Sequence, residues 1–150
     1  MKRLMILSSL IALMFISCGN KQTSDDLNWT TDLGKAVQQA KTENKAVLVN
    51  FTGSDWCQWC FKLSGEVFST DEFKEYADNN LILVKVDFPQ NIEQTYQTKM
   101  YNQSLAQKFG VQGFPTVIII NSKGVPVAKT GYQSGGPVKY INQIKGFLGS

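Results

Sequence analysis

Two stretches of the chain are almost continuously apolar and rich in β-branched residues. They cover residues 46–51 and 81–87, and the second is followed by Phe88 and Pro89. Unbroken apolar runs of this length are typical of strands that are covered on both faces, as in the middle of a parallel sheet. The pattern therefore predicts two central, buried strands.

Helical spacing of apolar residues is found before, between and after these two runs. A first helix is expected from a capping Asp32 to about Asn44. A helix between the two strands is expected to begin at a capping box formed by Ser69 and Glu72. A last helix is expected to begin near Pro137, because proline suits a first helical turn. The inward face predicted for this last helix consists of Val138, Ile141, either Ile144 or the aliphatic stem of Lys145, and Leu148.

The chain after the second strand is more polar, and its helical pattern is weaker. A weak stripe extends as far as Gln103, and a firmer helix is expected from Ser104 to the residue before Gly110. Residues 116–120 and 125–130 are two short runs separated by a Gly-containing turn, which predicts an antiparallel hairpin. The predicted order is helix, strand, helix, strand, helix, strand, strand, helix.

Length, charge and the absence of histidine narrow the possible functions. With 150 residues the chain has room for one compact domain and one active site. Without Lys2 and Arg3, which belong to a predicted leader, the 15 basic residues fall to 13 against 12 acidic ones. A nearly neutral surface gives no electrostatic reason to expect nucleic acid. The absence of histidine excludes a Cys-His or Ser-His-Asp catalytic set and a histidine-bearing zinc site within the chain.

The N-terminus has the pattern of a bacterial export signal. Lys2 and Arg3 precede an apolar stretch, residues 4–16, which is shorter than the roughly 20 residues that span a bilayer as a helix. The stretch ends at Ser17-Cys18-Gly19, which resembles the lipobox of bacterial lipoproteins, although Phe15 stands where that motif usually has an aliphatic residue. Cys18 is therefore expected to carry lipid; an ordinary cleaved signal and an uncleaved anchor are the alternatives.

The predicted export signal and lipidation site divide the chain into three parts. Residues 1–17 are expected to form the signal peptide, residues 18–30 the lipidated N-terminus with a flexible polar tether, and residues 31–150 the folded domain. The protein is then expected on the periplasmic or cell-surface face of a bacterial membrane, held there by its lipid anchor.

Cys57 and Cys60 directly follow the first buried strand and open a helix. At such a position, unpaired backbone amides and the helix dipole stabilise a thiolate. Cys57 is expected to be the more exposed thiol and the nucleophile, and Cys60, one turn further in, is placed to resolve a mixed disulfide. An inert structural bridge, half of a metal site and two unconnected core thiols are the competing interpretations.

Two motifs together resemble thioredoxin. The first is residues 51–60, which contain Trp56-Cys57-Gln58-Trp59-Cys60, and the second is residues 105–116, which end in Gly113-Phe114-Pro115-Thr116. The resemblance covers about residues 46–148. It implies an α/β thioredoxin fold, with a central mixed β-sheet flanked by helices, and a Cys57-Cys60 disulfide. It also implies that Pro115 is cis beside the cysteines and that Trp56, Trp59, Phe114 and Pro115 contact substrate; a strand-entry proline and buried tryptophans are the alternatives.

The chain departs from thioredoxin at two places in this region. Asn50 stands near the position of the family's buried aspartate, so that the usual acid beside the second cysteine is missing, and Asp55 or Glu66 is a weak substitute. Gln58-Trp59 replaces the Gly-Pro that the family carries between its cysteines. The redox potential and the redox partner therefore do not follow from the resemblance.

The sequence predicts a thiol-disulfide oxidoreductase without metal or cofactor. It is expected to reduce or reshuffle disulfides of exported proteins and to receive electrons from a membrane thiol donor. The alternative is a lipoprotein that keeps the fold as a non-catalytic module for binding peptides or proteins, since a fold does not determine a function.

Overall fold

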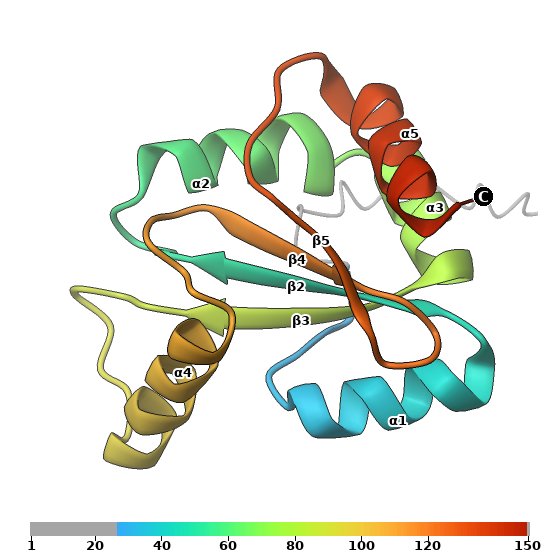
Figure 1. The fold of residues 1–150 in the computed structure, drawn as a ribbon. Helices are drawn as coiled ribbons and strands as arrows, with labels where there is room; N and C mark the ends of the chain where they lie inside the picture. The colour runs from blue at the N-terminus through green and yellow to red at the C-terminus, as the bar shows by residue number, and fades with distance from the viewer. Residues whose placement is uncertain (1–26, 150) are drawn as a thin grey trace, which may run out of the picture.

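The computed structural model describes residues 27–149, and the predicted signal peptide and Cys18 lie outside this range. Within it, five strands form one mixed sheet in the order β1-β3-β2-β4-β5 (Figure 1). The two predicted buried strands, β2 and β3, are parallel and central, while β4 and β5 form the predicted antiparallel hairpin. The strands are β1 (Trp29–Thr30), β2 (Ala46–Thr52), β3 (Leu81–Asp87), β4 (Thr116–Ile120) and β5 (Pro126–Thr130).

Helices cover both faces of this sheet. Helices α2, α3 and α5 lie on one face, and α1 and α4 lie on the other (Figure 1). The alternation of side chains along β2 serves both layers, because Leu48 packs with the first group of helices and Val49 with the second. The helices are α1 (Leu33–Glu43), α2 (Gln58–Leu63), the π-helix η1 (Ser64–Phe68), α3 (Asp71–Asn80), α4 (Tyr96–Lys108) and α5 (Gly136–Leu148).

The folded domain begins earlier than the sequence indicated. Trp29 and Thr30 form β1, which pairs with Leu83 and Val84 of β3, and Leu27 is buried in the core. The segment from Leu27 to Thr30 therefore belongs to the sheet layer and not to the tether expected for residues 18–30. A two-residue strand has no periodicity of its own, so its place becomes visible only in the paired sheet.

Two predicted helix starts were wrong. Thr70, and not Ser69, caps α3, because its hydroxyl oxygen accepts the N–H of Phe73 while the N–H of Ser69 closes the preceding π-helix. Helix α4 begins behind a capping Thr95 and not at Ser104. Tyr96, at the start of α4, is 77% exposed, which explains why the apolar stripe of this half of the helix was too weak to define it.

The last helix begins where proline predicted, but its inward face is rotated. Ile141 and Ile144 are buried as expected, whereas Val138 is 59% exposed. Tyr140 is buried in its place and donates its hydroxyl to the carbonyl oxygen of Gly131 at 3.1 Å. An aromatic residue with a polar tip was therefore part of the core face, and the apolar pattern alone did not include it.

Candidate active site

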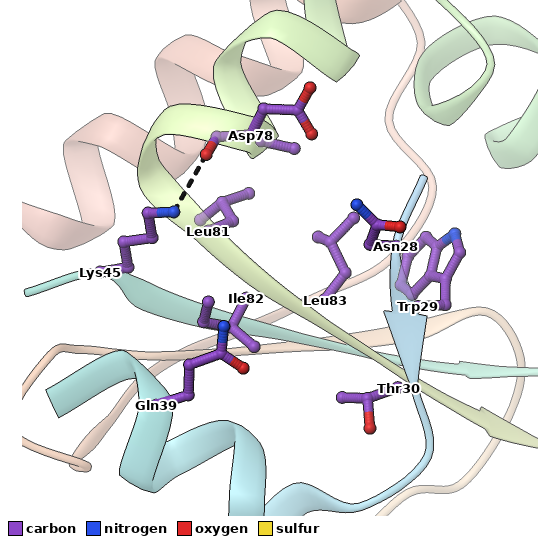
Figure 2. Close-up of a pocket in the computed structure, with 10 residues that line it drawn as sticks. Asn28, Trp29, Thr30, Gln39, Lys45, Asp78, Leu81, Ile82 and Leu83 are labelled. Atoms are coloured by element: carbon purple, nitrogen blue, oxygen red, sulfur yellow. Dashed lines mark hydrogen bonds between the residues drawn. The ribbon is translucent and has the colours of Figure 1, made fainter. Parts of the chain in front are cut away.

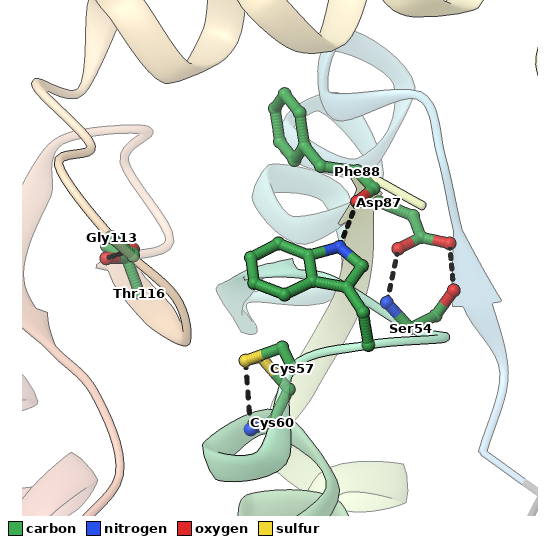
Figure 3. The surroundings of a disulfide bond; sticks show 8 residues. Ser54, Cys57, Cys60, Asp87, Phe88, Gly113 and Thr116 are labelled. Atoms are coloured by element: carbon green, nitrogen blue, oxygen red, sulfur yellow. Dashed lines mark hydrogen bonds between the residues drawn. A yellow bond between two sulfur atoms is a disulfide. The ribbon is translucent and has the colours of Figure 1, made fainter. Parts of the chain in front are cut away.

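The cysteine pair lies where β2 passes into α2. Cys57 is the N-cap residue of α2, and Cys57 Sγ and Cys60 Sγ form a disulfide with a Cα–Cα distance of 5.2 Å. Cys57 Sγ also accepts the backbone N–H of Cys60 at 3.2 Å (Figure 3). The first turn of the helix thus directs an amide at this sulfur, and the same amide can stabilise negative charge on it after reduction.

The two cysteine residues differ in their surroundings but not in their exposure. Cys57 is 5% exposed and Cys60 is 6% exposed, so the greater exposure expected for Cys57 is not found in the disulfide form. Cys60 lines a partly open cavity of about 120 Å³, and Cys57 is not among the residues that line it. The asymmetry therefore comes from the amide at Cys57 and from the cavity at Cys60.

The turn before Cys57 is fastened to the segment that follows β3. Ser54 donates both its backbone N–H and its hydroxyl to the carboxylate of Asp87, at 2.9 and 2.5 Å (Figure 3). The indole N–H of Trp56 donates to the carbonyl oxygen of Phe88 at 2.8 Å. A Cβ atom on Gly53 would lie 2.5 Å from the Trp56 ring, so the indole occupies space that only glycine leaves open. These contacts hold the turn that leads from β2 to Cys57 against the segment after β3.

Asp55 adds a second fastening between the same two segments. Its carboxylate accepts the backbone N–H groups of Gln90 and Asn91 at 2.9 and 2.6 Å. The hydrogen bond from Gln90 is the main reason that the pKa of Asp55 is lowered. Asp55 is thus engaged in holding a loop and does not replace the missing acid beside Cys60.

Trp56 and Phe114 come together with Phe88 in one aromatic cluster. Phe114 packs edge-on against Trp56, with ring centroids 6.0 Å apart, and stacks on Phe88 at 5.0 Å. The Phe114–Pro115 peptide bond is cis, as the resemblance to thioredoxin implied. The next residue, Thr116, closes this segment by donating its hydroxyl to the carbonyl oxygen of Gly113 at 2.7 Å (Figure 3). The second motif therefore lies against the turn that leads to Cys57.

A second aromatic cluster, not foreseen from the sequence, surrounds Trp59. This side chain is 56% exposed, and its ring lies 5.4 Å from that of Tyr132. Lys62 Nζ lies 5.4 and 5.3 Å from the two ring centroids. The Tyr132 hydroxyl donates to Glu66 at 2.6 Å, which raises the tyrosine pKa, and Glu66 is not among the residues that line the cavity at Cys60. Trp59 is therefore a surface residue and not part of the core.

A further hollow, of about 360 Å³, lies at the edge of the sheet (Figure 2). It is lined by the strand β1 on one side and by the start of β3 on the other, with Lys45 donating to the carbonyl oxygen of Asp78 at its rim. Neither cysteine lines this hollow. In residues 27–149 there is no group of three acidic or cysteine side chains that could hold a metal ion, and no helix is long and apolar enough to span a membrane.

These features define the class of the protein. A CxxC disulfide at the N-cap of a helix, reached from the central strand of a mixed sheet and flanked by a cis-proline segment, is the site of a thioredoxin-fold thiol-disulfide oxidoreductase. A sequence model of the thioredoxin-like domain matches residues 33–143. The chain belongs to the thioredoxin-like family, and it is a thiol-disulfide oxidoreductase.

The proteins to which this chain is similar include members of the same class. The disulfide bond reductase DsbH of Chlamydia pneumoniae is 35% identical over 82% of this chain and 74% of its own length. A solved structure of a DsbH oxidoreductase superposes with a TM-score of 0.77 at 34% identity, over 85% of this chain and 88% of that one. The thioredoxin-related protein DsbJ of Chlamydia pneumoniae is 26% identical over 87% of this chain, which spans only 38% of DsbJ.

Proposed function

We propose that the protein reduces disulfides of exported proteins, with Cys57 as the nucleophile and Cys60 as the resolving thiol. The hydrogen bond from the Cys60 N–H to Cys57 Sγ carries this assignment, because it stabilises a thiolate at Cys57. The similarity to a protein described as a disulfide bond reductase supports the direction of electron flow.

The thiols of Cys57 and Cys60 together supply the two electrons of the reaction. The Cys57 thiolate bonds to one sulfur of the substrate disulfide, and the other sulfur leaves as a thiolate that takes a proton from solvent. Cys60 then loses its proton and bonds to Cys57, and the substrate sulfur attached to Cys57 leaves and is protonated in turn. The substrate has gained two electrons and two protons, and the Cys57-Cys60 disulfide must be reduced again by a membrane thiol donor.

The two aromatic clusters provide a surface on which a substrate can lie. Trp56 and Phe114 flank one side of the cysteine pair, and Trp59 projects from the first turn of α2. Pro115 joins the first cluster to β4 and offers its neighbouring backbone to an extended segment. Aromatic faces favour an unfolded or extended substrate, because such a chain exposes apolar side chains next to its cysteines.

The N-terminal pattern supports the location of this activity. A basic start, a short apolar stretch and Ser17-Cys18 are the features of an exported lipoprotein. We infer that the mature protein begins at Cys18 and is held by lipid on the outer side of a bacterial membrane, where disulfide-bearing exported proteins are found.

A trapping experiment in the native cell tests the function. Cys60→Ser should accumulate mixed disulfides between Cys57 and exported proteins, because the first step proceeds and the second is blocked. Cys57→Ser is the matched control and should trap nothing. Equal trapping by both variants would show that either thiol can attack and would contradict the assignment, and trapping by Cys57→Ser alone would reverse the order of the thiols. The absence of traps, together with a disulfide that exchanges with no small thiol, would favour the non-catalytic binding lipoprotein.

A further inference from the structure

A partly open cavity leads from the surface of α2 to the second cysteine. Its lining includes Phe61 and Ser64, which are exposed, and Asn50 and Cys60, which are buried. The cavity therefore begins at the surface, beside α2 and η1, and ends at the disulfide. Its volume of about 120 Å³ has room for several molecules of the size of water and no room for a protein chain. Only a small molecule can reach Cys60 by this route.

The lining of the cavity favours a small anion that carries a hydrogen. Asn50 Oδ1 is buried and has no hydrogen-bond partner among the residues that the structure describes. A buried amide oxygen left unpaired is costly, so a ligand with a donor is favoured beside it. Lys85 also lines the cavity, and none of the ion pairs in residues 27–149 involves it. Its positive charge raises the local concentration of anions.

The two sulfur atoms of the disulfide are not equivalent toward such an anion. Cys57 does not line the cavity, so a molecule inside it meets the bond from the side of Cys60. Exchange depends on which sulfur is attacked, and it is faster when the departing thiolate is more stable. Cys57 Sγ accepts the backbone N–H of Cys60 at 3.2 Å, which stabilises a thiolate there (Figure 3). Attack from the cavity on Cys60 therefore expels the stabilised thiolate.

We propose that the cavity admits hydrosulfide, a very small anionic sulfur nucleophile, to Cys60 of the oxidised protein and that hydrosulfide opens the disulfide there. A lone pair of hydrosulfide forms a bond to Cys60 Sγ, the Cys60–Cys57 bond breaks, and its electron pair leaves on Cys57 Sγ. The products are a Cys60 persulfide, whose outer sulfur keeps the hydrosulfide proton, and a Cys57 thiolate. One sulfur–sulfur bond replaces another, so no further oxidant or reductant is needed. The proposal rests on the exchange activity of this disulfide and adds a second entrance, while protein substrates react at Cys57.

The test compares two reagents on the oxidised full-length protein. Sodium hydrosulfide is small enough for the cavity, whereas tris(2-carboxyethyl)phosphine is too bulky for it and must open the disulfide from outside. The rate of opening is followed by quenching with excess N-ethylmaleimide and by mass spectrometry of the peptide that carries both cysteines. Ser64→Leu, which narrows the mouth of the cavity, should slow opening by hydrosulfide about tenfold, equivalent to about 1.4 kcal/mol in the barrier. It should leave the rate with the phosphine unchanged.

Ser69→Leu is the matched control, because Ser69 is an exposed serine at the other end of η1 that does not line the cavity. It should change neither rate. Ser64→Gln is a second blocking variant and should act as Ser64→Leu does if the leucine variant does not fold. The proposal is overturned if blocking Ser64 does not slow hydrosulfide, if it slows the phosphine equally, or if Ser69→Leu slows hydrosulfide as much. Such a failure would leave the trapping by Cys60→Ser unaffected, because those traps form at Cys57.

Discussion

The indole N–H of Trp56 lies 2.8 Å from the backbone carbonyl oxygen of Phe88, so that the residue before Cys57 is bonded to the segment after β3. This contact links the approach to the cysteine pair with the end of a central strand. It also places Trp56 against Phe114, which precedes Pro115. One side chain therefore connects the two motifs of the candidate site.

Trp56→Phe should lower the free energy of unfolding by about 0.5 to 1 kcal/mol, because the ring contact with Phe114 is retained and the hydrogen bond is lost. Urea unfolding measures this change. Trp59→Phe is the control. Trp59 is 56% exposed, and within residues 27–149 its indole N–H donates to no acceptor. If the two variants lose equal stability, the bond to Phe88 does not fasten the turn.

Asp55→Asn should lower stability near neutral pH and have less effect in acid. The pKa of Asp55 in the folded protein lies below its ordinary value of 3.8, mainly because of the N–H of Gln90. A carboxyl group with a lowered pKa stabilises the fold above its unfolded pKa, and this stabilisation is lost as the pH falls through the folded value. Urea unfolding of both proteins at pH 7 and at low pH should show the difference shrinking. A difference that stays constant would mean that the charge of Asp55 is not involved.

Gly131→Ala should displace the backbone around Pro115, which Gly131 approaches closely. A Cβ atom at Gly131 would lie 2.8 Å from the carbonyl oxygen of Pro115, and backbone cannot move aside as a flexible side chain can. We expect a loss of about 1 to 3 kcal/mol in stability and slower exchange with disulfide substrates. Gly113→Ala is the control, because a Cβ there meets nothing within 4 Å. A Gly131→Ala protein with unchanged exchange would separate this close approach from the chemistry.

Cys18→Ala should abolish fatty-acid labelling of the full-length protein in a bacterial host. The expectation follows from the basic start, the apolar stretch and the Ser17-Cys18 junction. Membrane fractionation should then find the variant released or retained only by an uncleaved leader. Labelling that persists without Cys18 would show that lipid is attached elsewhere.

The central sheet could be predicted because its signals are local. Residues 46–51 and 81–87 are long apolar runs, and the turn at residues 121–124 separates two short strands. The cysteine pair was equally visible, because Cys57 and Cys60 are three residues apart and directly follow a predicted strand. Patterns that repeat within one element were therefore sufficient for these parts.

Features that depend on distant residues could not be predicted in this way. Trp59 meets Tyr132 only because the chain after β5 returns beside α2. The cavity beside Cys60 is formed by side chains from several elements, among them Asn50 of β2 and Lys85 of β3, and its size depends on how these elements pack. Asn50, at the position of the family's acid, was visible in the sequence, but its pairing with Lys85 of β3 became visible only in the folded sheet.

The reduction potential of the Cys57-Cys60 couple tests the central claim most directly. A strongly oxidising couple requires a very low thiolate pKa, and the residues between the cysteines, Gln58 and Trp59, supply no charge for this purpose. The N–H of Cys60 should stabilise the Cys57 thiolate only moderately. Equilibration of the full-length protein with thiol buffers of defined potential should therefore give a value between about −180 and −270 mV, as expected of a reductase. A value more oxidising than about −150 mV would contradict the account and identify a protein that forms disulfides.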